Sequence, residues 1–253
     1  MNSSNLTLRG SLAVVTGGTK GIGRGITLAL AEAGADLAVV SRSPDTDLEQ
    51  RIQALGRRFV HLAADLSRRE ETRELVPEVI RKLGEPDILV NNAGICLRKP
   101  ALEFSEADWD QSLEINLSAP FILSRAAARG MQGKKRGKII NVASVLSFQG
   151  GINIPAYAAS KHGIAGLTKS MGNDLAPLGI NVNAIAPGYF KTEFTEAIQN
   201  DRQRAESIMA RTPAGRWGDP QQDIGGLAVF LASSASDFVN GAILPVDGGW
   251  LAR

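Results

Sequence analysis

Tyr157 and Lys161 have the chemistry of an acid/base and a cationic partner, and they stand four residues apart in a predicted helix. Residues at i and i+4 share a helix face, with Cβ atoms about 5–6 Å apart. A tyrosine with its ordinary pKa near ~10 is a poor base at neutral pH, and a pKa of about 7 requires roughly 4 kcal/mol of preferential stabilisation of the phenolate. A nearby ammonium in a partly dry site can supply much of that, and an oxidised nicotinamide would add to it. Taken alone, the spacing also fits an exposed helical pair.

Two further polar residues stand where a substrate could be held. Ser144 follows the predicted strand 138–143, and open α/β sheets bind ligands at the carboxyl ends of their strands. Its hydroxyl could hydrogen-bond a substrate oxygen, or it could only cap a turn. Asn116 lies within an otherwise helical run, although its amide competes for backbone groups. A buried polar role is expected for Asn116, with an exposed helix position as the alternative.

A glycine-rich turn, TGGTKGIG at 16–23, joins the predicted strand 12–15 to a helix. Gly17, Gly21 and Gly23 allow a tight turn and a close approach of the backbone to a pyrophosphate. The helix N-terminus then offers free N–H groups and a partial positive charge to the anion. An ordinary glycine turn is the alternative. A P-loop is excluded because no Gly-Lys-Ser/Thr ends the turn.

The tip of the second predicted strand, 37–40, indicates which dinucleotide binds. An acidic residue there binds the ribose 2′-hydroxyl of NAD, whereas an arginine accepts the 2′-phosphate of NADP. The sequence continues with Ser41 and Arg42 and has no carboxylate at this point. Lys20 in the glycine turn could add a second positive charge. The sequence therefore favours NADP over NAD, unless these side chains are merely solvated.

These residues lie in a chain that alternates short apolar runs with longer helical stretches. Continuous runs of Val, Ile and Leu are typical of parallel strands covered on both faces. We therefore expect an α/β fold with a doubly wound, Rossmann-type parallel sheet of about seven strands and helices on both faces. Strands are predicted at 12–15, 37–40, 58–62, 87–90, 138–143, 180–185 and 242–246, and helices at 25–33, 47–55, 68–83, 106–130, 157–175 and 221–231.

Residues 1–253 are expected to form a single dinucleotide-binding and catalytic domain, because no linker or repeat interrupts them. The longest irregular stretch, about 187–220, is predicted to be a substrate loop, since long loops in compact domains are usually lids or binding loops.

Composition excludes several classes of protein. Twenty-eight basic and 26 acidic residues give a formal net charge of +2, too balanced for electrostatic binding of nucleic acid. No apolar run is long enough to span a membrane. With one cysteine, Cys96, and two histidines, neither an internal disulfide nor a metal site is expected. A cytoplasmic protein with a small-molecule substrate fits these limits.

The motifs together resemble the short-chain dehydrogenase/reductase family over nearly the whole chain. They are the glycine turn, Asp65-Leu66, NNAG at 91–94, Asn116, Ser144, Tyr157, Lys161 and Pro187-Gly188. The resemblance implies that Tyr157 is the general acid/base, that Lys161 lowers its pKa and holds the nicotinamide ribose, and that Ser144 orients the carbonyl or alcohol. It also implies that Asn116 holds a proton-relay water.

With the residues derived above, the resemblance gives a set of expected cofactor contacts. Asp65 and Leu66 would flank the adenine, 92–94 the adenosine ribose, and 187, 188 and 192 the nicotinamide. The expected contacts are Gly17, Thr19, Lys20, Gly21, Ile22, Gly23, Ser41, Arg42, Asp65, Leu66, Asn92, Ala93, Gly94, Tyr157, Lys161, Pro187, Gly188 and Thr192.

Several segments, including SFQGG at 147–151 and VDGGWLAR at 246–253, resemble the group of 2-dehydro-3-deoxy-D-gluconate 5-dehydrogenases and 2-deoxy-D-gluconate 3-dehydrogenases. Members act on sugar acids, generally with NAD, so NAD stays possible here. A carboxylate substrate needs cations or donors, and Arg98 and Gln149 are the candidates, beside Ser144 and Tyr157 at the reacting carbon. Where members usually carry two adjacent arginines, only Arg98 matches.

Two other functions remain open. A 3-oxoacyl-carrier-protein reductase shares all the catalytic residues, and a non-catalytic dinucleotide-binding regulator would keep only the cofactor site. The family resemblance implies a homotetramer, with an exposed Trp250 as a candidate interface residue. His61 is expected to be structural, His162 to lie on the surface or in packing, and Cys96 to be a buried or half-buried thiol.

Overall fold

In the computed structural model, which describes residues 3–253, seven strands form one sheet in the order β3-β2-β1-β4-β5-β6-β7. Every neighbouring pair is parallel. The doubly wound, Rossmann-type sheet predicted from the sequence is therefore confirmed. The strands are β1 (Leu12–Thr16), β2 (Asp36–Ser41), β3 (Phe59–Ala63), β4 (Ile88–Asn91), β5 (Gly137–Val142), β6 (Ile180–Pro187) and β7 (Ile243–Val246).

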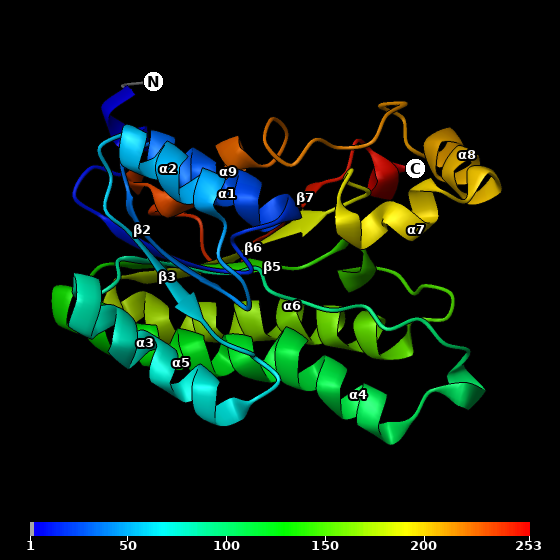
Figure 1. The fold of residues 1–253 in the computed structure, drawn as a ribbon, viewed down its shortest axis with the longest axis horizontal. Helices are drawn as coiled ribbons and strands as arrows, with labels where there is room; N and C mark the ends of the chain where they lie inside the picture. The colour runs from blue at the N-terminus through cyan, green and yellow to red at the C-terminus, as the bar shows by residue number, and fades with distance from the viewer. Residues whose placement is uncertain (1–2) are drawn as a thin grey trace.

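Helices cover both faces of this sheet (Figure 1), with α1, α2 and α9 on one side and α3, α4, α5 and α6 on the other. The helices are α1 (Gly21–Glu32), α2 (Thr46–Ala54), α3 (Arg69–Leu83), α4 (Glu106–Leu113), α5 (Ala119–Lys134), α6 (Pro155–Leu175), α7 (Glu196–Gln199), α8 (Arg202–Arg211) and α9 (Gly225–Ala232). None of the helices in residues 3–253 combines the length and apolar character needed to cross a membrane.

Two apolar cores explain why the strands are continuously hydrophobic. In β1, Ala13 and Val15 pack into the core under α1 and α9. Leu12 and Val14 alternate with them and pack into the opposite core, under α3 and α5. Since successive side chains of a strand point to opposite faces, a strand buried on both faces is apolar at most positions, on either side.

The long helix predicted over 106–130 is divided. One turn of π-helix, Glu114–Ser118, lies between α4 and α5, and α5 continues to Lys134. Asn116 lies in this wider turn and is only 2% exposed. π-Turns in helices frequently mark functional positions. The asparagine that interrupts the apolar pattern is therefore buried, as expected.

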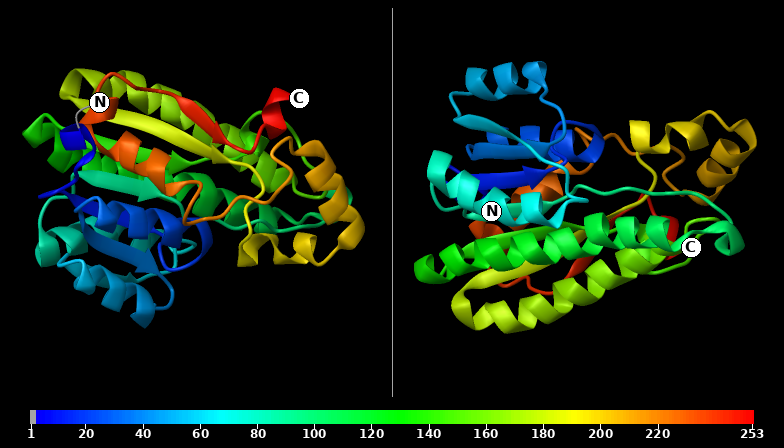
Figure 2. Two further views of the ribbon diagram at one scale, coloured as in Figure 1. Left: turned by 90° about the horizontal axis from the view of Figure 1, so that it is seen from above. Right: turned by 60° about the horizontal axis from the view of Figure 1, so that its bottom comes forward.

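The stretch 187–220, predicted to be irregular, contains two helices. The Asp201 carboxylate accepts the backbone N–H of Arg204 and caps α8. Only Ile208 of α8 is buried, so the helix has little of the apolar periodicity by which the sequence would reveal it. In Figure 2, the α7–α8 segment extends beyond the sheet at the end to which the strands point.

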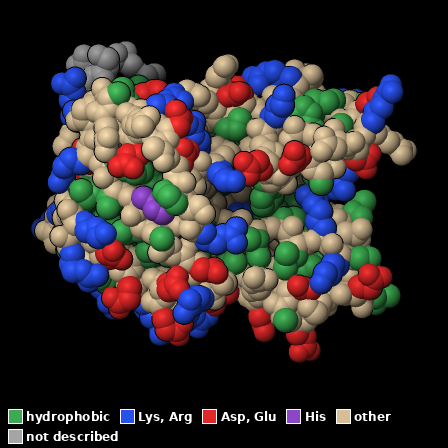
Figure 3. Space-filling view, in the orientation of Figure 1, with side chains coloured by type: hydrophobic (Ala, Val, Ile, Leu, Met, Phe, Trp, Pro, Cys, Tyr) green, Lys and Arg blue, Asp and Glu red, His purple; other side chains and the backbone are tan. Residues whose placement is uncertain are grey.

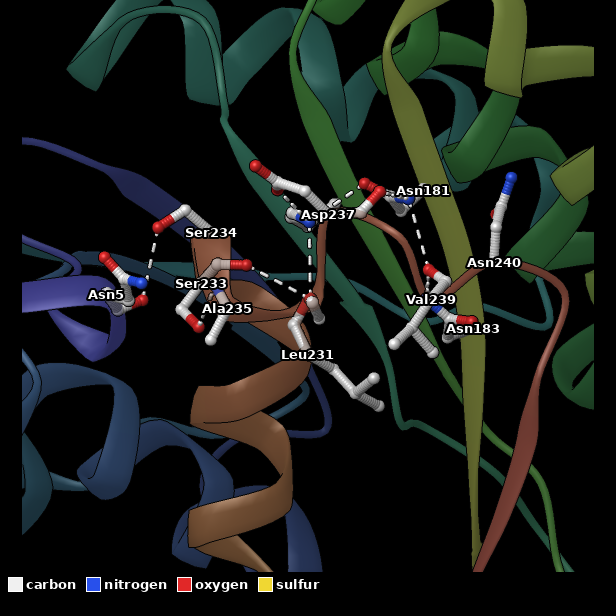
Figure 4. A network of polar contacts seen from close by, with 12 residues as sticks. Asn5, Asn181, Asn183, Leu231, Ser233, Ser234, Ala235, Asp237, Val239 and Asn240 are labelled. Carbon is white, nitrogen blue, oxygen red and sulfur yellow. Dashed lines mark hydrogen bonds and ion pairs between the residues drawn. The ribbon is translucent and has the colours of Figure 1, made fainter. Parts of the chain in front are cut away.

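A polar network ties the segment that precedes the edge strand β7 to the start of β6 (Figure 4). The Asn181 amide donates to the carbonyls of Asp237 (3.0 Å) and Val239 (3.1 Å), and Asn183 donates to that of Val239 (2.8 Å). Lys138 at the start of β5 pairs with Asp237 at 2.7 Å. These contacts hold the amino ends of β5 and β6 in place. The carboxyl ends of the strands are bordered by loops.

Gly25 sets how closely α1 approaches the loop before α9. A Cβ at this position would lie 1.8 Å from the carbonyl oxygen of Pro220, which is backbone and must shift. We predict that Gly25→Ala lowers the free energy of unfolding by about 2 kcal/mol or more, or the melting temperature by roughly 4–8 °C. Thermal unfolding followed by circular dichroism measures this.

Gly226→Ala is the matched control, since Gly226 lies in α9 with no atom within 4 Å of an added Cβ. It should leave the protein equally or slightly more stable, because alanine favours helix by about 0.5–1 kcal/mol. Equal melting temperatures for Gly25→Ala and wild type would show that the close approach is not required.

Candidate active site

A cleft of about 1100 Å³ opens at the carboxyl edge of the sheet, between the glycine turn, β5 and α8. Figure 3 shows the molecule hollowed here, with Lys and Arg side chains around the opening. All residues that the sequence proposed as cofactor or substrate contacts line it, and so do Ser144, Tyr157 and Lys161. Asn116 alone among the predicted residues does not.

The glycine turn lies at one end of this cleft, and its backbone conformation and packing require glycine at three positions. Gly17 (φ +63°) and Gly21 (φ +48°) have left-handed backbones, and a Cβ on Gly23 would stand 2.2 Å from the Gly17 carbonyl oxygen. The Asn92 amide donates to the carbonyls of Thr16 (2.9 Å) and Gly17 (3.1 Å), which holds the turn against β4.

No side chain caps the N-terminus of α1. Its first N–H groups therefore remain available to an anion in the cleft. A bare glycine turn that leads into an uncapped helix fits the pyrophosphate of a dinucleotide.

The tip of β2 lines the end of the cleft where the sequence predicts the adenosine of the cofactor. The Ser41 hydroxyl donates to the Ser43 carbonyl (2.7 Å) and lies 2.9 Å from His61 Nε2. Because the Ser41 hydroxyl proton is donated to Ser43, His61 Nε2–H is the donor to Ser41 Oγ. His61 thus supports the tip, as expected for a structural residue. Arg42 beside it is one of the charges that lower the pKa of Asp65, after hydrogen bonds from Ser67.

Lys20 pairs with Glu193 at 2.9 Å, with both side chains exposed. This contact joins the glycine turn to the segment that precedes α7. An exposed pair of this kind contributes little to stability. Lys20 therefore lies at the cleft as predicted, while the Glu193 carboxylate, which no sequence motif predicts, partly neutralises its charge.

Lys161 is buried at the centre of the site, with 5% of the residue exposed. Its Nζ donates to the Val142 carbonyl at 2.6 Å and lies 5.6 Å from the centre of the Tyr157 ring. The helical spacing therefore places the two residues together, as expected. Burial lowers the pKa of Lys161 to about 8, because the charged form loses hydration.

Burial also raises the pKa of Tyr157, whereas its hydrogen bond with Ser144 and the positive charge of Arg98 act to lower it. The direction is opposite to the one expected from Lys161 alone, because desolvation of the phenolate outweighs the nearby cations. The protein by itself therefore holds Tyr157 as a phenol, a form that can donate a proton.

Ser144 caps a turn, as one of its two expected roles requires, while its hydrogen bond to a substrate oxygen stays a prediction. Its Oγ accepts the Leu146 N–H at 3.1 Å and caps the short 3₁₀ turn Val145–Ser147, and it is also hydrogen-bonded with Tyr157. At the end of that turn, Ser147 Oγ donates to the backbone carbonyl of Lys161 at 2.6 Å. The loop after β5 therefore fixes Ser144 and the start of α6 together.

Asn116 supports the site from behind the cleft wall. Its amide exchanges two hydrogen bonds of 2.9 Å with the backbone of Ile95 and donates to Ser160 Oγ at 3.1 Å. These bonds fix the chain just before Cys96 and Arg98. Cys96 is half-buried as predicted, and burial raises the pKa of its thiol.

The far end of the cleft contains residues that sequence analysis missed. Arg211 from α8 donates to Gln149 Oε1 at 3.1 Å and stacks 4.0 Å above the Trp250 ring. Trp250 also packs on Tyr189, with ring centres 4.7 Å apart. Trp250 was predicted to be exposed for an interface, but it is 5% exposed, because these two side chains of its own chain cover it.

Sheet, glycine turn and the Tyr157–Lys161 pair together define a nicotinamide-dependent oxidoreductase. The chain belongs to the short-chain dehydrogenase/reductase family, and the family model described as enoyl-(acyl carrier protein) reductase matches residues 17–251. As in its relatives, the activity is oxidation of a CH–OH group or, in reverse, reduction of the corresponding carbonyl.

Among individual proteins, the chain is 50% identical over 251 residues to the 2-dehydro-3-deoxy-D-gluconate 5-dehydrogenase of Escherichia coli K12, with 99% of both chains covered. It is 52% identical to the enzyme of the same name from Bacillus subtilis, covering 98% of this chain and 97% of that one. A solved gluconate 5-dehydrogenase from Burkholderia cenocepacia, in complex with NADP and tartrate, has 40% identity and a TM-score of 0.94 over 100% of both chains.

The buried lysine makes stability depend on pH. Its pKa is about 8 in the folded protein and 10.5 as the ordinary value, so the unfolded chain binds more protons between these pH values. The free-energy cost of burying the charged Lys161 side chain is complete below pH 8 and disappears by pH 10.5. We predict that Lys161→Met unfolds with a higher free energy than wild type at pH 7, and that this difference shrinks by roughly 2–3 kcal/mol toward pH 10.

Urea unfolding at pH 7 and pH 10 measures the difference. Lys169→Met changes an exposed lysine of the same helix and should show no comparable pH dependence relative to wild type. A constant difference between Lys161→Met and wild type across this range would mean that Lys161 is not desolvated in the folded protein.

Proposed function

We propose that this enzyme transfers hydride between NADP(H) and a secondary alcohol or ketone of a sugar acid, of the 2-dehydro-3-deoxy-D-gluconate or 2-deoxy-D-gluconate type. The observation that carries the proposal is the identity of about 50% to 2-dehydro-3-deoxy-D-gluconate 5-dehydrogenases over nearly their whole length. The tartrate in the Burkholderia structure supports a cleft that accepts hydroxy acids in this group of proteins.

Tyr157 is the proton donor in reduction and the acceptor in oxidation. As a phenol hydrogen-bonded with Ser144, it can protonate the oxygen of a carbonyl that Ser144 orients. The bound nicotinamide supplies or takes up the hydride, and its oxidised form adds the positive charge that a Tyr157 phenolate needs. Lys161 contributes a second charge and a donor within the same dry site.

Asn116 acts through the backbone that it holds. Its hydrogen bonds to Ile95 are compatible with the expected role beside a proton-relay water, which stays a prediction. Arg98, at the cleft wall, is proposed to bind the carboxylate of the sugar acid, and Gln149, whose Oε1 is held by Arg211, presents its amide N–H groups for a hydroxyl or carboxylate oxygen.

NADP is the proposed physiological cofactor, held by the glycine turn, the 92–94 segment and the β2 tip. Arg42 lines the adenosine end of the cleft, where the structure offers no carboxylate on the β2 tip for a ribose 2′-hydroxyl. A solved relative from Agrobacterium tumefaciens, provisionally described as a 2-deoxy-D-gluconate 3-dehydrogenase, contains bound NADP; it is 47% identical, with a TM-score of 0.92, over 98% of this chain and 99% of that one.

Arg42→Leu tests the cofactor proposal. It should raise KM for NADPH by about tenfold or more, because a charge-assisted contact with the 2′-phosphate is lost, while KM for NADH changes little. Lys20→Gln should have a smaller effect, since Lys20 already pairs with Glu193. Steady-state kinetics with both cofactors measure these KM values. Equal changes in KM for NADPH and NADH would contradict the role of Arg42.

A screen of substrates tests the proposed function itself. Purified enzyme is assayed with 2-dehydro-3-deoxy-D-gluconate, D-gluconate and 3-oxoacyl thioesters, with both cofactors, by the absorbance of the reduced nicotinamide. We expect turnover of a sugar acid that Tyr157→Phe reduces at least a hundredfold. Preference for thioesters would favour a 3-oxoacyl-carrier-protein reductase, a function named for a structural neighbour of only 28% identity. Cofactor binding without any turnover would favour a regulator.

Residues 187–220 are proposed to be the substrate loop of a single domain, because Tyr189, Arg204 and Arg211 from this stretch all line the cleft.

We further propose a homotetramer. The α5–α6 face supports self-association, since it has a shallow groove lined by Leu117, Phe121 and Leu167. Light scattering should give about four times the 26.8 kDa of one chain. The cytoplasmic location stays a prediction.

A further inference from the structure

One face of α8 is turned toward the substrate end of the cleft. The residues of this helix that line the cleft are Arg204, Ser207, Ile208 and Arg211. Their spacing of three, four and seven residues is that of a single helix face. Apart from Ile208, which is buried, this inner face is polar and carries two guanidinium groups. An inner face of this composition suits an anionic ligand better than an apolar core.

The arginines of α8 differ in what they bind. Arg202, on the outer face, pairs with Glu206 at 2.8 Å. Arg211 is held between Gln149 and Trp250. For the side chain of Arg204, by contrast, there is no hydrogen bond or ion pair with any residue in 3–253. Arg204 is therefore a cation at the cleft without a partner from the described chain.

Arg98, on the wall formed by the loop after β4, has the same property: its guanidinium also lacks a hydrogen-bonding or ionic partner within residues 3–253. Both arginines line the same cleft. The charges of both act to lower the pKa of Cys96 and of Tyr189, so both lie near these two side chains at the substrate end. Two unpaired cations from separate elements therefore border one volume.

The carboxylates of the cleft do not neutralise this pair. Asp65 and Glu193 are the acidic residues that line it, and Glu193 is paired with Lys20. Asp65 lies after β3, where its pKa responds to Arg42 and Arg68 rather than to Arg98 or Arg204. Both arginines are exposed, so their mutual repulsion is weak, and a carboxylate bonded to both guanidinium groups would gain charge-assisted hydrogen bonds from each.

We propose that Arg204 is a specificity-determining residue that binds the carboxylate of the substrate together with Arg98. Guanidinium groups suit this task, because each offers two parallel N–H donors to the two oxygens of a carboxylate. The pair would make the enzyme prefer sugar acids to neutral sugars. The inference rests on the proposed function for the identity of the substrate, but the carboxylate site itself depends only on the two arginines.

Arg204→Gln and Arg98→Gln are tested against Arg202→Gln, a change on the outer face of the same helix. Turnover is measured for D-gluconate and for D-glucitol, which has a CH₂OH group in place of the carboxylate. Binding of D-gluconate to the enzyme–NADPH complex is measured by calorimetry, a readout that requires no reaction. The Kd of NADPH alone reports whether the cofactor site is intact.

Arg204→Gln should weaken D-gluconate binding and lower kcat/KM for it by about tenfold to a hundredfold, the range expected for a lost hydrogen bond to a charged group. The change should lie in KM rather than kcat, and activity with D-glucitol should be unchanged or improved. The double variant should lose less than the product of the two single losses, because both arginines bind one group. Arg202→Gln should behave as wild type.

Equal losses for D-gluconate and D-glucitol, or wild-type affinity of Arg204→Gln for D-gluconate, would overturn the inference. These outcomes differ from failure of the proposed function, in which the wild-type enzyme turns over no sugar acid. In that case a loss of calorimetric D-gluconate binding in Arg204→Gln, but not in Arg202→Gln, would still support the carboxylate site. Wild-type enzyme that converts no sugar acid and does not bind D-gluconate would contradict both.

Discussion

The hydrogen bond from Lys161 to the Val142 carbonyl is the constraint on which the site depends. Removing an ammonium group from water costs several kcal/mol unless it finds compensating partners. Here one short bond to the last residue of β5 offsets part of that cost, and the lowered pKa shows that it does not offset all of it. The position of the cation is therefore set by the end of a strand.

The same strand end orders the rest of the proposed catalytic group. Ser144 follows Val142 by two residues, and the 3₁₀ turn after it is bonded back to the carbonyl of Lys161 through Ser147. The first turns of α6 then hold Tyr157 beside both. Three side chains from two elements are aligned because the loop between them is bonded at both ends, which is the preorganisation that acid–base catalysis requires.

Most of the fold and of the cofactor end could be predicted from sequence, because their signals are local. The glycine turn, the β2 tip and the Tyr157–Lys161 spacing each lie within eight residues or fewer. What could not be predicted depends on contacts between distant segments. Arg211 meets Gln149 across 62 positions of the chain, and Trp250 is covered by side chains that the local pattern does not reveal. The balance between burial and charge at Tyr157 also needs the three-dimensional surroundings, because burial raises the pKa in the chain alone, while the lowering expected from Lys161 with a bound nicotinamide stays a prediction.

The weak apolar pattern of α8 has a physical consequence beyond the difficulty of predicting it. The position of α8 rests on a small set of contacts: Ile208 packs in an apolar cluster with Ile198 and Trp250, and Arg211 bonds to Gln149. Elements with few buried contacts are those that open at low free-energy cost, and ligand-binding segments are drawn from them. The end of β5 therefore fixes Tyr157 and Lys161 through short hydrogen bonds, whereas α8, which buries only Ile208, is the part of the cleft wall whose adjustment to a ligand would cost least.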